Sequence, residues 1–277
     1  MMQLLAAQTR RRSRLALLAG VLAWLPLSGA AVEIVAHRGA SYDAPENTLP
    51  AVELGWEKGA DAVEVDIHQT SDGNVVAIHD RDTWRVTGKR GVVAEMRLDQ
   101  LLLLDAGAWK GSQWSGTRIP TLGQVLETVP PGKTLVVEIK CPRDVLPELE
   151  RVLDASGKRE QAMLIAFDYE TISEAKQRMP DRPCYWLYGF SESEAATYGV
   201  RSRDDLLERV QRAALDGLDV RHSGAWTAGL ADALRKLGKA LYVYTVNDAD
   251  QARRLRDAGV AGITTDRPAF IREALAE

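Results

Sequence analysis

Side chains that could do chemistry recur at the ends of short apolar runs in this sequence. They are, in chain order, His37-Arg38, Glu64-Val65-Asp66, His79-Asp80 and Glu138-Ile139-Lys140. Carboxylates bind hard divalent cations, imidazoles transfer protons near neutral pH, and arginine and lysine bind anions. The combination predicts a cation site with a proton carrier beside it. Arg38 and Lys140 either form structural ion pairs or bind an anionic phosphate.

The acidic residues are spaced to share one face of a strand. Strand side chains alternate, so Glu64 and Asp66 point to the same side. The apolar neighbours would pack against helices, which directs both carboxylates to the interior, where unpaired charge is costly. An ordinary solvated pair is the alternative. Glu138, from a neighbouring strand, could add a third oxygen ligand, and such a set suits Mg²⁺, Ca²⁺ or Mn²⁺ better than zinc.

A tight hairpin is predicted directly after the Glu64–Asp66 strand. The short gap before the next apolar run is too small for a parallel crossover. Asp72-Gly73 is typical of a two-residue hairpin turn. Symmetric pairing about this turn places His79 opposite Asp66, with their Cβ atoms about 4.5–5.5 Å apart.

Four histidines occur in the chain, and two of them are candidates for proton transfer. His37 and His79 end sheet strands beside acidic residues, so we expect a functional role rather than a structural one. We expect His68 to be an exposed residue of the hairpin, with contact to a substrate as the alternative. His222 ends a strand without an acidic partner nearby in the sequence and receives no role.

Short β-rich runs alternate with helical stretches, which predicts a parallel sheet covered by helices. The expected strands are Ile34–Ala36, Ala62–Ile67, Val75–His79, Leu135–Ile139, Met163–Ala166, Tyr185–Tyr188, Gly217–Val220, Leu241–Val246 and Gly262–Thr264. The expected helices are Thr48–Lys58, Val145–Ala155, Thr171–Met179, Asp204–Leu215, Leu230–Leu237 and Ala249–Ala258. Because the third strand folds back antiparallel, eight parallel strands remain, and we predict an α/β TIM (β/α)₈ barrel. A doubly wound sheet is the alternative, but no Gly-x-Gly-x-x-Gly follows the first strand.

Residues 81–120 do not fit a strand–helix step. They contain Trp84, Trp109 and Trp114, several glycines and a short helix-like segment, Leu98–Leu104. We predict a small insertion at the barrel mouth, where a long loop is usually functional. The tryptophans either pack in the insertion's own small core, which we expect, or enter a membrane.

The composition is that of a globular protein, and the first residues are typical of an export signal. The chain is 45% hydrophobic and 27% charged, which excludes disorder. Its net charge is −4, and about −8 without the four arginines between positions 10 and 14, which argues against nucleic-acid binding. A signal peptide is predicted over residues 1–31, before a mature domain over 32–277. Its features are these arginines, the apolar run Leu15–Leu27 and the small residues 28–31. The run is too short for a membrane anchor, so we expect a periplasmic or secreted protein.

The two cysteines are too few for a disulfide scaffold. Cys141 follows the C-terminal end of the strand Leu135–Ile139. Cys184 precedes the strand Tyr185–Tyr188, so it lies nearer the opposite end of the barrel. Export would permit a disulfide, but Cα atoms more than about 7 Å apart cannot be bridged. We therefore predict two free thiols.

Taken together, these motifs resemble those of the glycerophosphodiester phosphodiesterase family. The matching segments are His37–Ser41, Ala44–Thr48, Glu64–Asp66, Asp72–Gly73, His79–Asp80, Leu104–Gly107, Ile119–Leu122, Glu138–Lys140, Val243–Asn247 and Thr264–Pro268. They cover almost everything after the leader in the family's order. Tyr244 departs from the pattern, because many members have tryptophan there, and this leaves the headgroup preference open.

The resemblance implies a TIM barrel that hydrolyses glycerophosphodiesters to glycerol 3-phosphate and an alcohol such as choline or ethanolamine. It implies one divalent cation, Mg²⁺ or Ca²⁺ with Mn²⁺ as a further choice. The implied site residues are Glu64, Asp66 and Glu138 for the cation, His37 and His79 for acid–base catalysis, Arg38 and Lys140 for the phosphate, and Tyr244 and Asn247 for the substrate.

Two other functions remain open from the sequence. One is a phospholipase that cleaves headgroups from lyso- or intact phospholipids, although a basic amphipathic membrane helix is missing from the mature sequence. The other is a binding protein for glycerophosphodiesters without catalysis, against which the retained histidines and acids argue. The sequence does not decide which histidine is the base, whether water or the glycerol hydroxyl attacks, or the oligomeric state.

Overall fold

Eight parallel strands close into a barrel, and a ninth pairs antiparallel at its edge. The sheet order is β1-β9-β8-β7-β6-β5-β4-β2-β3, and pairing of β1 with β2 completes the circle. The computed structural model describes residues 31–222, 227 and 229–276, so most of the predicted signal peptide lies outside the described residues. The strands are β1 Glu33–Ala36, β2 Ala62–Gln69, β3 Val75–Ala77, β4 Thr134–Ile139, β5 Ala162–Ala166, β6 Cys184–Tyr188, β7 Gly217–Arg221, β8 Ala240–Tyr244 and β9 Gly262–Thr265. The predicted TIM barrel is confirmed, and the doubly wound alternative is wrong because the sheet is closed.

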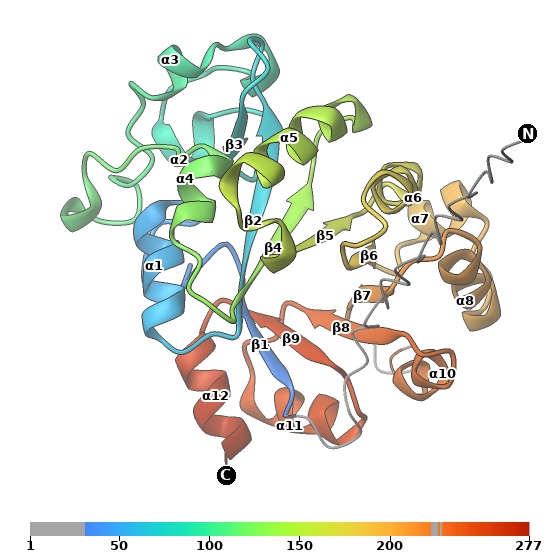
Figure 1. Ribbon diagram of the computed structural model, residues 1–277. Helices are drawn as coiled ribbons and strands as arrows, with labels where there is room; N and C mark the ends of the chain where they lie inside the picture. Colours follow the sequence, from blue (N-terminus) through green and yellow to red (C-terminus); the bar gives the residue numbers. More distant parts are fainter. Residues whose placement is uncertain (1–30, 223–226, 228, 277) are drawn as a thin grey trace, which may run out of the picture.

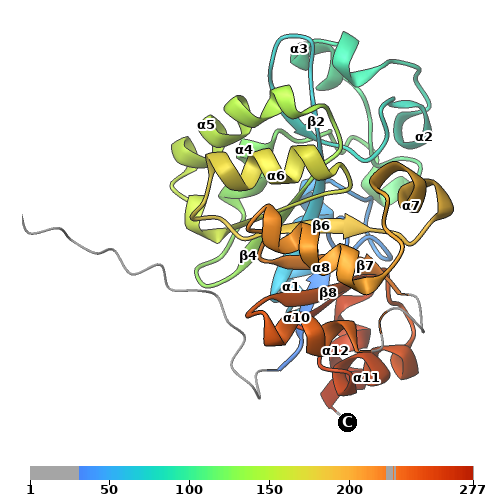
Figure 2. The same ribbon diagram turned by 90° about the vertical axis from the view of Figure 1, so that its right-hand side faces the viewer.

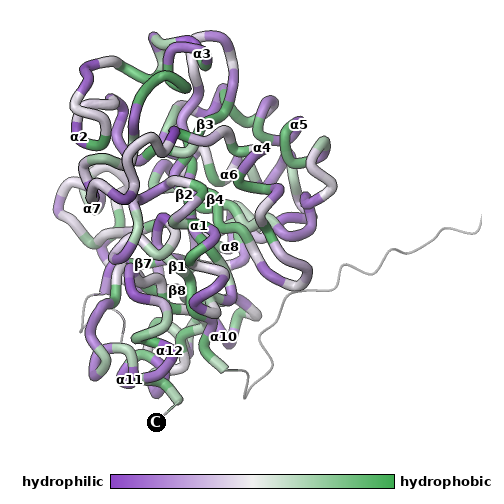
Figure 3. The backbone as a smooth tube through the Cα atoms, turned by 90° about the vertical axis from the view of Figure 1, so that its left-hand side faces the viewer, coloured by the Kyte–Doolittle hydropathy of each residue, from purple (hydrophilic) through white to green (hydrophobic). Residues whose placement is uncertain are grey.

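Helices surround the barrel and cover its outer face (Figures 1 and 2). They are α1 Leu49–Glu57, α4 Leu122–Glu127, α5 Leu146–Ser156, α6 Tyr169–Arg178, α7 Glu192–Tyr198, α8 Arg203–Arg212, α10 Leu230–Lys236, α11 Ala249–Asp257 and α12 Pro268–Ala276, and the short α2 Trp84–Thr87 and α3 Leu98–Leu101 lie between β3 and α4. Hydrophilic and hydrophobic stretches alternate along these helices (Figure 3), as expected when one face packs inward. The helices α4, α7 and α12 were not expected from the sequence.

Side-chain caps explain where several of these helices begin. Thr48, Asp168 and Ser202 each accept a hydrogen bond from a backbone N–H in the first turn of the helix that follows. Such bonds satisfy donors that have no partner within the helix. Thr121 and Gln124 form a reciprocal capping box at the start of α4.

Apolar side chains fill the part of the barrel interior that lies toward the N-terminal ends of the strands. This inner core consists of Val35, Ala62, Val136, Met163, Ile165, Tyr185, Leu187, Ala240 and Tyr242. Two residues further along β2, β4 and β7, the inward side chain changes from apolar or glycine to acidic, at Glu64, Glu138 and Asp219. The alternation of the strands therefore sets polar groups on an apolar floor at the C-terminal end of the barrel.

The hairpin between β2 and β3 differs from the predicted register by one residue. Ile67 pairs with Ala77, and the Ile78 backbone N–H donates to the carbonyl oxygen of Asp66 at 3.0 Å. Ile78, not His79, therefore lies opposite Asp66. The connection has three residues rather than two, because Thr70 pairs with Asn74 and Gly73 adopts a φ of +84°. His79 lies beyond the last paired residue.

The insertion (residues 81–120) has a small core that does not consist of its tryptophans. The buried residues are Val86, Val93, Leu101, Ala106 and Ile119, together with Val76 and Ile78 of the hairpin. Trp84 and Trp109 are 51% and 42% exposed, so the expectation that tryptophans form this core is wrong. Figure 1 shows the insertion on the side of the molecule opposite α11 and α12.

Cys141 and Cys184 are both free, as predicted, and Cys184 is buried. Burial raises the pKa of the Cys141 thiol to about 11, so it is a weak nucleophile at neutral pH.

Within residues 31–222, 227 and 229–276, no helix combines the length and apolar character needed to cross a bilayer.

Gly39 is required by the close packing of the loop after β1 against α1. It has a φ of +81°, and a Cβ atom there would lie 2.3 Å from the backbone carbon of Ala51. We expect Gly39→Ala to destabilise the fold by about 2–4 kcal/mol, because both the backbone conformation and the contact are violated. Gly73→Ala is the matched control, since its φ is +84° but its Cβ would meet nothing within 4 Å. Equal melting temperatures for the two variants would contradict the close-packing argument.

Candidate active site

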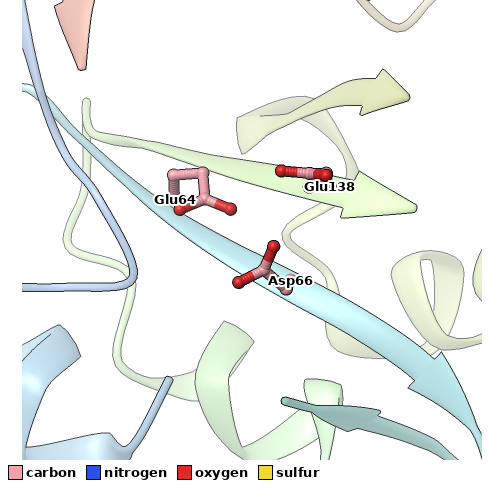
Figure 4. A group of neighbouring side chains, drawn as sticks. All are labelled: Glu64, Asp66 and Glu138. Carbon is pink, nitrogen blue, oxygen red and sulfur yellow. The ribbon is translucent and has the colours of Figure 1, made fainter. Parts of the chain in front are cut away.

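Three buried carboxylates from two neighbouring strands form a cluster at the C-terminal end of the barrel. Glu64 and Asp66 lie on β2 and Glu138 on β4, where Asp66 pairs with Glu138 in the strand register. One oxygen from each lies within 4.8 Å of the others, and all three residues are buried. Figure 4 shows the carboxylates gathered on the same side of the two strands. The predicted acidic cluster is therefore assembled by the fold.

Mutual repulsion and burial set the proton affinities of this cluster. Burial, with repulsion from Asp66 and Glu138, raises the pKa of Glu64 well above its usual range. Burial, reinforced by Asp66, raises the pKa of Glu138 to about 7. Burial opposes ionisation of Asp66 as well, but nearby Arg38 and Lys140 outweigh it and lower the pKa of Asp66. A cation would relieve this concentration of charge.

Two oxygens of the cluster have unused bonding capacity. Oε1 of Glu64 and Oδ1 of Asp66 are buried, and neither accepts a hydrogen bond from any residue in the described part of the chain. The nearest cation to Asp66 Oδ1 is Lys140 Nζ, at 3.5 Å. Buried polar atoms without partners are costly, and a hard divalent cation would satisfy both. The donor set is entirely oxygen, so these residues fit Mg²⁺, Ca²⁺ or Mn²⁺.

Arg38 and Lys140 flank the carboxylates. Arg38 Nε lies 3.2 Å from Asp66 Oδ2, and its backbone N–H donates to Glu64 Oε2 at 2.8 Å. Lys140 Nζ lies 2.9 Å from Glu138 Oε1. Both cations line the central cavity, which leaves them close to any ligand of the cluster. The ion-pair interpretation of the two residues is therefore confirmed, and both also face the cavity.

Asn47 fixes the position of Asp66. Its side-chain Nδ2 donates to Asp66 Oδ2 at 2.7 Å, and its Oδ1 accepts from the Asp66 backbone N–H at 3.0 Å. Asn47 adopts a positive φ of 57°, a conformation that asparagine tolerates better than most residues. This orienting role was not recognised from the sequence, although Asn47 lies in the second matching motif.

His37 lies at the end of β1 and is held by Asp266. Its Nδ1 is 2.6 Å from Asp266 Oδ1, which also accepts from Ser41 Oγ at 3.0 Å. Asn247 Nδ2 donates to the other oxygen of Asp266 at 2.6 Å. Burial opposes ionisation, but these partners bring the pKa of Asp266 to about 2. Asn247 is not among the residues that line the central cavity, and its side chain contacts Asp266 and Thr265.

His79 has an equivalent acidic partner. Its Nδ1 is 2.7 Å from Asp80 Oδ1, and Arg85 Nε donates to the other oxygen of Asp80 at 2.6 Å. Arg85 in turn forms a two-point ion pair with Glu46. Burial lowers the pKa of His79, and this outweighs the attraction of Asp66 and Asp80. Arg85 gave no signal in the sequence, because it comes from the insertion.

His68 is buried, which corrects the expectation of an exposed hairpin residue. Its Nε2 lies 3.1 Å from the backbone carbonyl oxygen of His79. His68 faces the same side as Glu64 and Asp66 because it continues their alternation along β2. It therefore supports the backbone that carries His79.

These groups surround a cavity of about 460 Å³. Its residues include His37, Arg38, Glu64, His79, Glu138 and Lys140 on one side and Asp219, Arg221, His222 and Tyr244 on the other. Oδ1 of Asp219 and the hydroxyl of Tyr244 are buried without a hydrogen-bond partner in the described ranges. Burial raises the pKa of Asp219 well above its usual range. Asp219 and Arg221 were not identified from the sequence, although their period-two spacing after Gly217 could have indicated inward-facing positions.

Comparisons with known proteins agree with this geometry. The model of the family described as "Glycerophosphoryl diester phosphodiesterase family" matches residues 37–270. The chain is similar to a glycerophosphodiester phosphodiesterase of Caldanaerobacter subterraneus, with 31% identity over 85% of this chain and 94% of that protein. It is 30% identical to a glycerophosphodiester phosphodiesterase of Bacillus subtilis, over 84% of this chain and 83% of that one.

Solved structures show the same similarity. An Oleispira antarctica phosphodiesterase in complex with the product sn-glycerol-3-phosphate is 26% identical, with a TM-score of 0.78, and the match covers 93% of this chain and 99% of that one. A glycerophosphodiester phosphodiesterase from Thermotoga maritima is also 26% identical, with a TM-score of 0.70 over 88% of this chain and 98% of that one. The similarity therefore extends over the whole barrel.

Proposed function

Since the chain belongs to the glycerophosphoryl diester phosphodiesterase family and is a phosphodiesterase, we propose that it hydrolyses glycerophosphodiesters such as glycerophosphocholine or glycerophosphoethanolamine. The products are glycerol 3-phosphate and a free alcohol. The observation that carries this proposal is the buried cluster of Glu64, Asp66 and Glu138, between two cationic side chains and two histidine–aspartate pairs.

Glu64, Asp66 and Glu138 would hold one divalent cation, Mg²⁺ or Ca²⁺ with Mn²⁺ as a further choice. When bound, such a cation neutralises phosphate charge and polarises a phosphoryl oxygen. The two unpartnered oxygens, on Glu64 and Asp66, support this assignment. Arg38 and Lys140 would bind the remaining phosphate oxygens, since both reach the same cavity and stay charged.

His37 and His79 are suited to move protons on the two sides of the phosphate. In each, an aspartate at Nδ1 fixes the ring and leaves Nε2 to accept or donate a proton. Burial favours the neutral form of His79 by lowering its pKa. A proton acceptor for the nucleophile and a proton donor for the leaving alcohol typically contribute about 10²–10⁴-fold each.

Asp219 and Tyr244 would receive the glycerol half of the substrate. Their unpartnered oxygens lie in the part of the barrel interior that is lined by Ile165 and Leu187. Hydroxyl groups of glycerol can donate to the carboxyl oxygen and exchange hydrogen bonds with the phenol. An apolar ligand would leave both polar groups unsatisfied, which costs about 1–3 kcal/mol for each.

Turnover of glycerophosphocholine tests the proposal against its two alternatives. We expect release of choline and glycerol 3-phosphate, measured by coupled enzymatic detection, and much slower cleavage of lysophosphatidylcholine. The exposed Trp84 and Trp109 are the observation that favours the phospholipase alternative. Faster turnover of the lysolipid would support that alternative, and binding without turnover would support a binding protein.

Export to the periplasm or the medium is part of the proposal. It is supported by the arginines, apolar run and small residues of the predicted signal peptide, residues 1–31. A small soluble diester would be the substrate in that compartment. N-terminal sequencing of exported protein should find a terminus near Ala31 or Val32, and a terminus before Leu15 would contradict it.

A further inference from the structure

A second groove meets the central cavity at His37 and Arg38. It has a volume of about 360 Å³ and is lined by His37, Arg38, Ser41, Tyr42, Glu46, Trp109, Lys110 and Asp266. Two of these, Trp109 and Lys110, come from the insertion, whereas the remainder belong to the barrel. A phosphodiester has two alcohol arms, so a site with hollows on both sides of its phosphate-binding residues matches that shape.

Hydrogen bonds fix the insertion's side of this groove. Trp109 Nε1 donates to the carbonyl oxygen of Ala106 at 2.8 Å, which sets the orientation of the indole. Asp105 accepts from the backbone N–H groups of Gly107, Ala108 and Gly116. The wall that carries Trp109 is therefore an ordered loop, close to the barrel.

Lys110 joins the insertion to the loop after β1. Its Nζ donates to the Ser41 carbonyl oxygen at 2.7 Å and lies 5.7 Å from the centre of the Trp109 ring. Within the described ranges it forms no ion pair with a carboxylate. The other charged residues of the groove are paired, Arg38 with Glu46 and His37 with Asp266. Lys110 is therefore the charged residue of the groove whose ammonium group faces no carboxylate partner among the described residues.

The aromatic rings of the groove already face cations. Arg267 lies 4.6 Å from the centre of the Tyr42 ring, and Lys110 lies over Trp109. A quaternary ammonium group binds best to free aromatic faces without competing positive charge. Hydroxyl groups, in contrast, can accept hydrogen bonds from the lysine ammonium and pack on the ring edges.

On the basis of the proposed function, we propose that this groove binds the leaving alcohol arm of the diester and favours uncharged polyhydroxyl or anionic alcohols over choline. The polarity of the central cavity and of the groove determines which of the two alcohol arms each of them would bind. The central cavity offers buried unpartnered oxygens on Asp219 and Tyr244, which suit the invariable glycerol half. The groove has exposed walls at Tyr42 and Trp109, which suit a variable alcohol.

Three substrates that share the glycerol phosphate half test this inference. They are glycerophosphoglycerol, glycerophosphocholine and glycerophosphomethanol, whose methyl group is too small to reach Trp109. We expect the wild type to prefer glycerophosphoglycerol to glycerophosphocholine in kcat/KM. Lys110→Glu should shift this ratio toward glycerophosphocholine by about tenfold, because the positive charge is reversed. Trp109→Ala should lower kcat/KM about 3–10-fold for glycerophosphoglycerol but leave glycerophosphomethanol unchanged.

The insertion supplies matched control variants. Arg90 lies 5.0 Å over the ring of Trp84, which is exposed to a similar degree as Trp109, but neither residue lines the groove. Arg90→Glu and Trp84→Ala should therefore leave the substrate ratio unchanged. Equal effects of Lys110→Glu on all three substrates, or a matching shift in the controls, would overturn the inference. Absence of turnover of every diester by the wild type would instead reject the proposed function, and this inference with it.

Discussion

Removal of divalent cations is expected to reduce turnover of glycerophosphocholine by more than about 10³-fold and to lower the melting temperature. The reason is the cluster of Glu64, Asp66 and Glu138, whose ionised forms repel one another inside the barrel. At a cation concentration of about 100 times Kd, binding stabilises the folded state by about 2.7 kcal/mol, which corresponds to roughly 5–10 °C. Chelation followed by calorimetry and an activity assay would measure both effects, and full activity after exhaustive chelation would contradict them.

The pH dependence of this stabilisation has a definite sign. The pKa of Glu138 in the folded, cation-free protein is about 7, above the unfolded value, so the folded state is favoured when this carboxyl is protonated. The contribution of Glu138 to the stability of the cation-free protein is therefore fully present below about pH 4.5 and is lost as pH rises through about 7. Cation binding requires the ionised forms, so affinity should weaken as pH falls below about 7. The gain in melting temperature on adding Mg²⁺ or Ca²⁺ should be larger at pH 8 than at pH 5.

A matched pair of variants separates cation binding from simple loss of a buried acid. Glu64→Gln removes a proposed ligand and should abolish the thermal response to cations. Glu33→Gln alters a partly buried acid on β1 that accepts a hydrogen bond from the Tyr242 hydroxyl, away from the cluster. It should change the melting temperature but preserve the cation response. An unchanged response in Glu64→Gln would remove that residue from the site.

The barrel could be predicted from the sequence because its signals are local and repeated. Each buried strand is a short β-rich run, and most helices begin at a capping residue that the sequence displays, such as Thr48 or Asp168. The short gap after the second strand was enough to exclude a parallel crossover. The hairpin register was not predictable, since Asp72-Gly73 is compatible with a two-residue turn, whereas the fold uses three residues and a positive φ at Gly73.

Site residues could be predicted where they lie on regular strands. They could not be predicted where tertiary contacts alone bring them together. Glu64 and Asp66 follow from alternation along β2, and Glu138 from the matching end of β4. Arg85 approaches Glu46 and Asp80 from the insertion, and no period or spacing indicates this meeting. Irregular segments have no fixed alternation, so their side-chain directions depend on tertiary contacts.

The exposed tryptophans illustrate the same limit. Aromatic residues in a segment of this size usually form its core, but aliphatic side chains such as Val93 and Leu101 occupy that position here. Trp109 remains available to the groove because its indole N–H is satisfied by a local carbonyl group. The fold thus places an aromatic surface beside His37.

His79→Ala is expected to remove most turnover while leaving cation affinity nearly intact, whereas Asp66→Ala should reduce both. Asp66 provides a charged oxygen within the cluster, and removing it also leaves Arg38 and Lys140 without their shared partner. His79 is a neutral imidazole whose pKa is lowered by burial, and imidazole is a poor ligand for Mg²⁺ or Ca²⁺. Loss of a proton-transfer group typically costs about 10²–10⁴-fold in kcat.

Calorimetric titration with Mg²⁺ or Ca²⁺ and steady-state kinetics on the two variants would separate these roles. The observed register supports the division, because Ile78 and not His79 lies opposite Asp66 in the hairpin. His79 is instead held by Asp80, which Arg85 fixes from the insertion. Arg85→Ala should therefore lower kcat more than it changes cation affinity, because it acts on the orientation of His79. If His79→Ala loses cation binding as severely as Asp66→Ala, His79 is a ligand of the cation and the proposed division of roles is wrong.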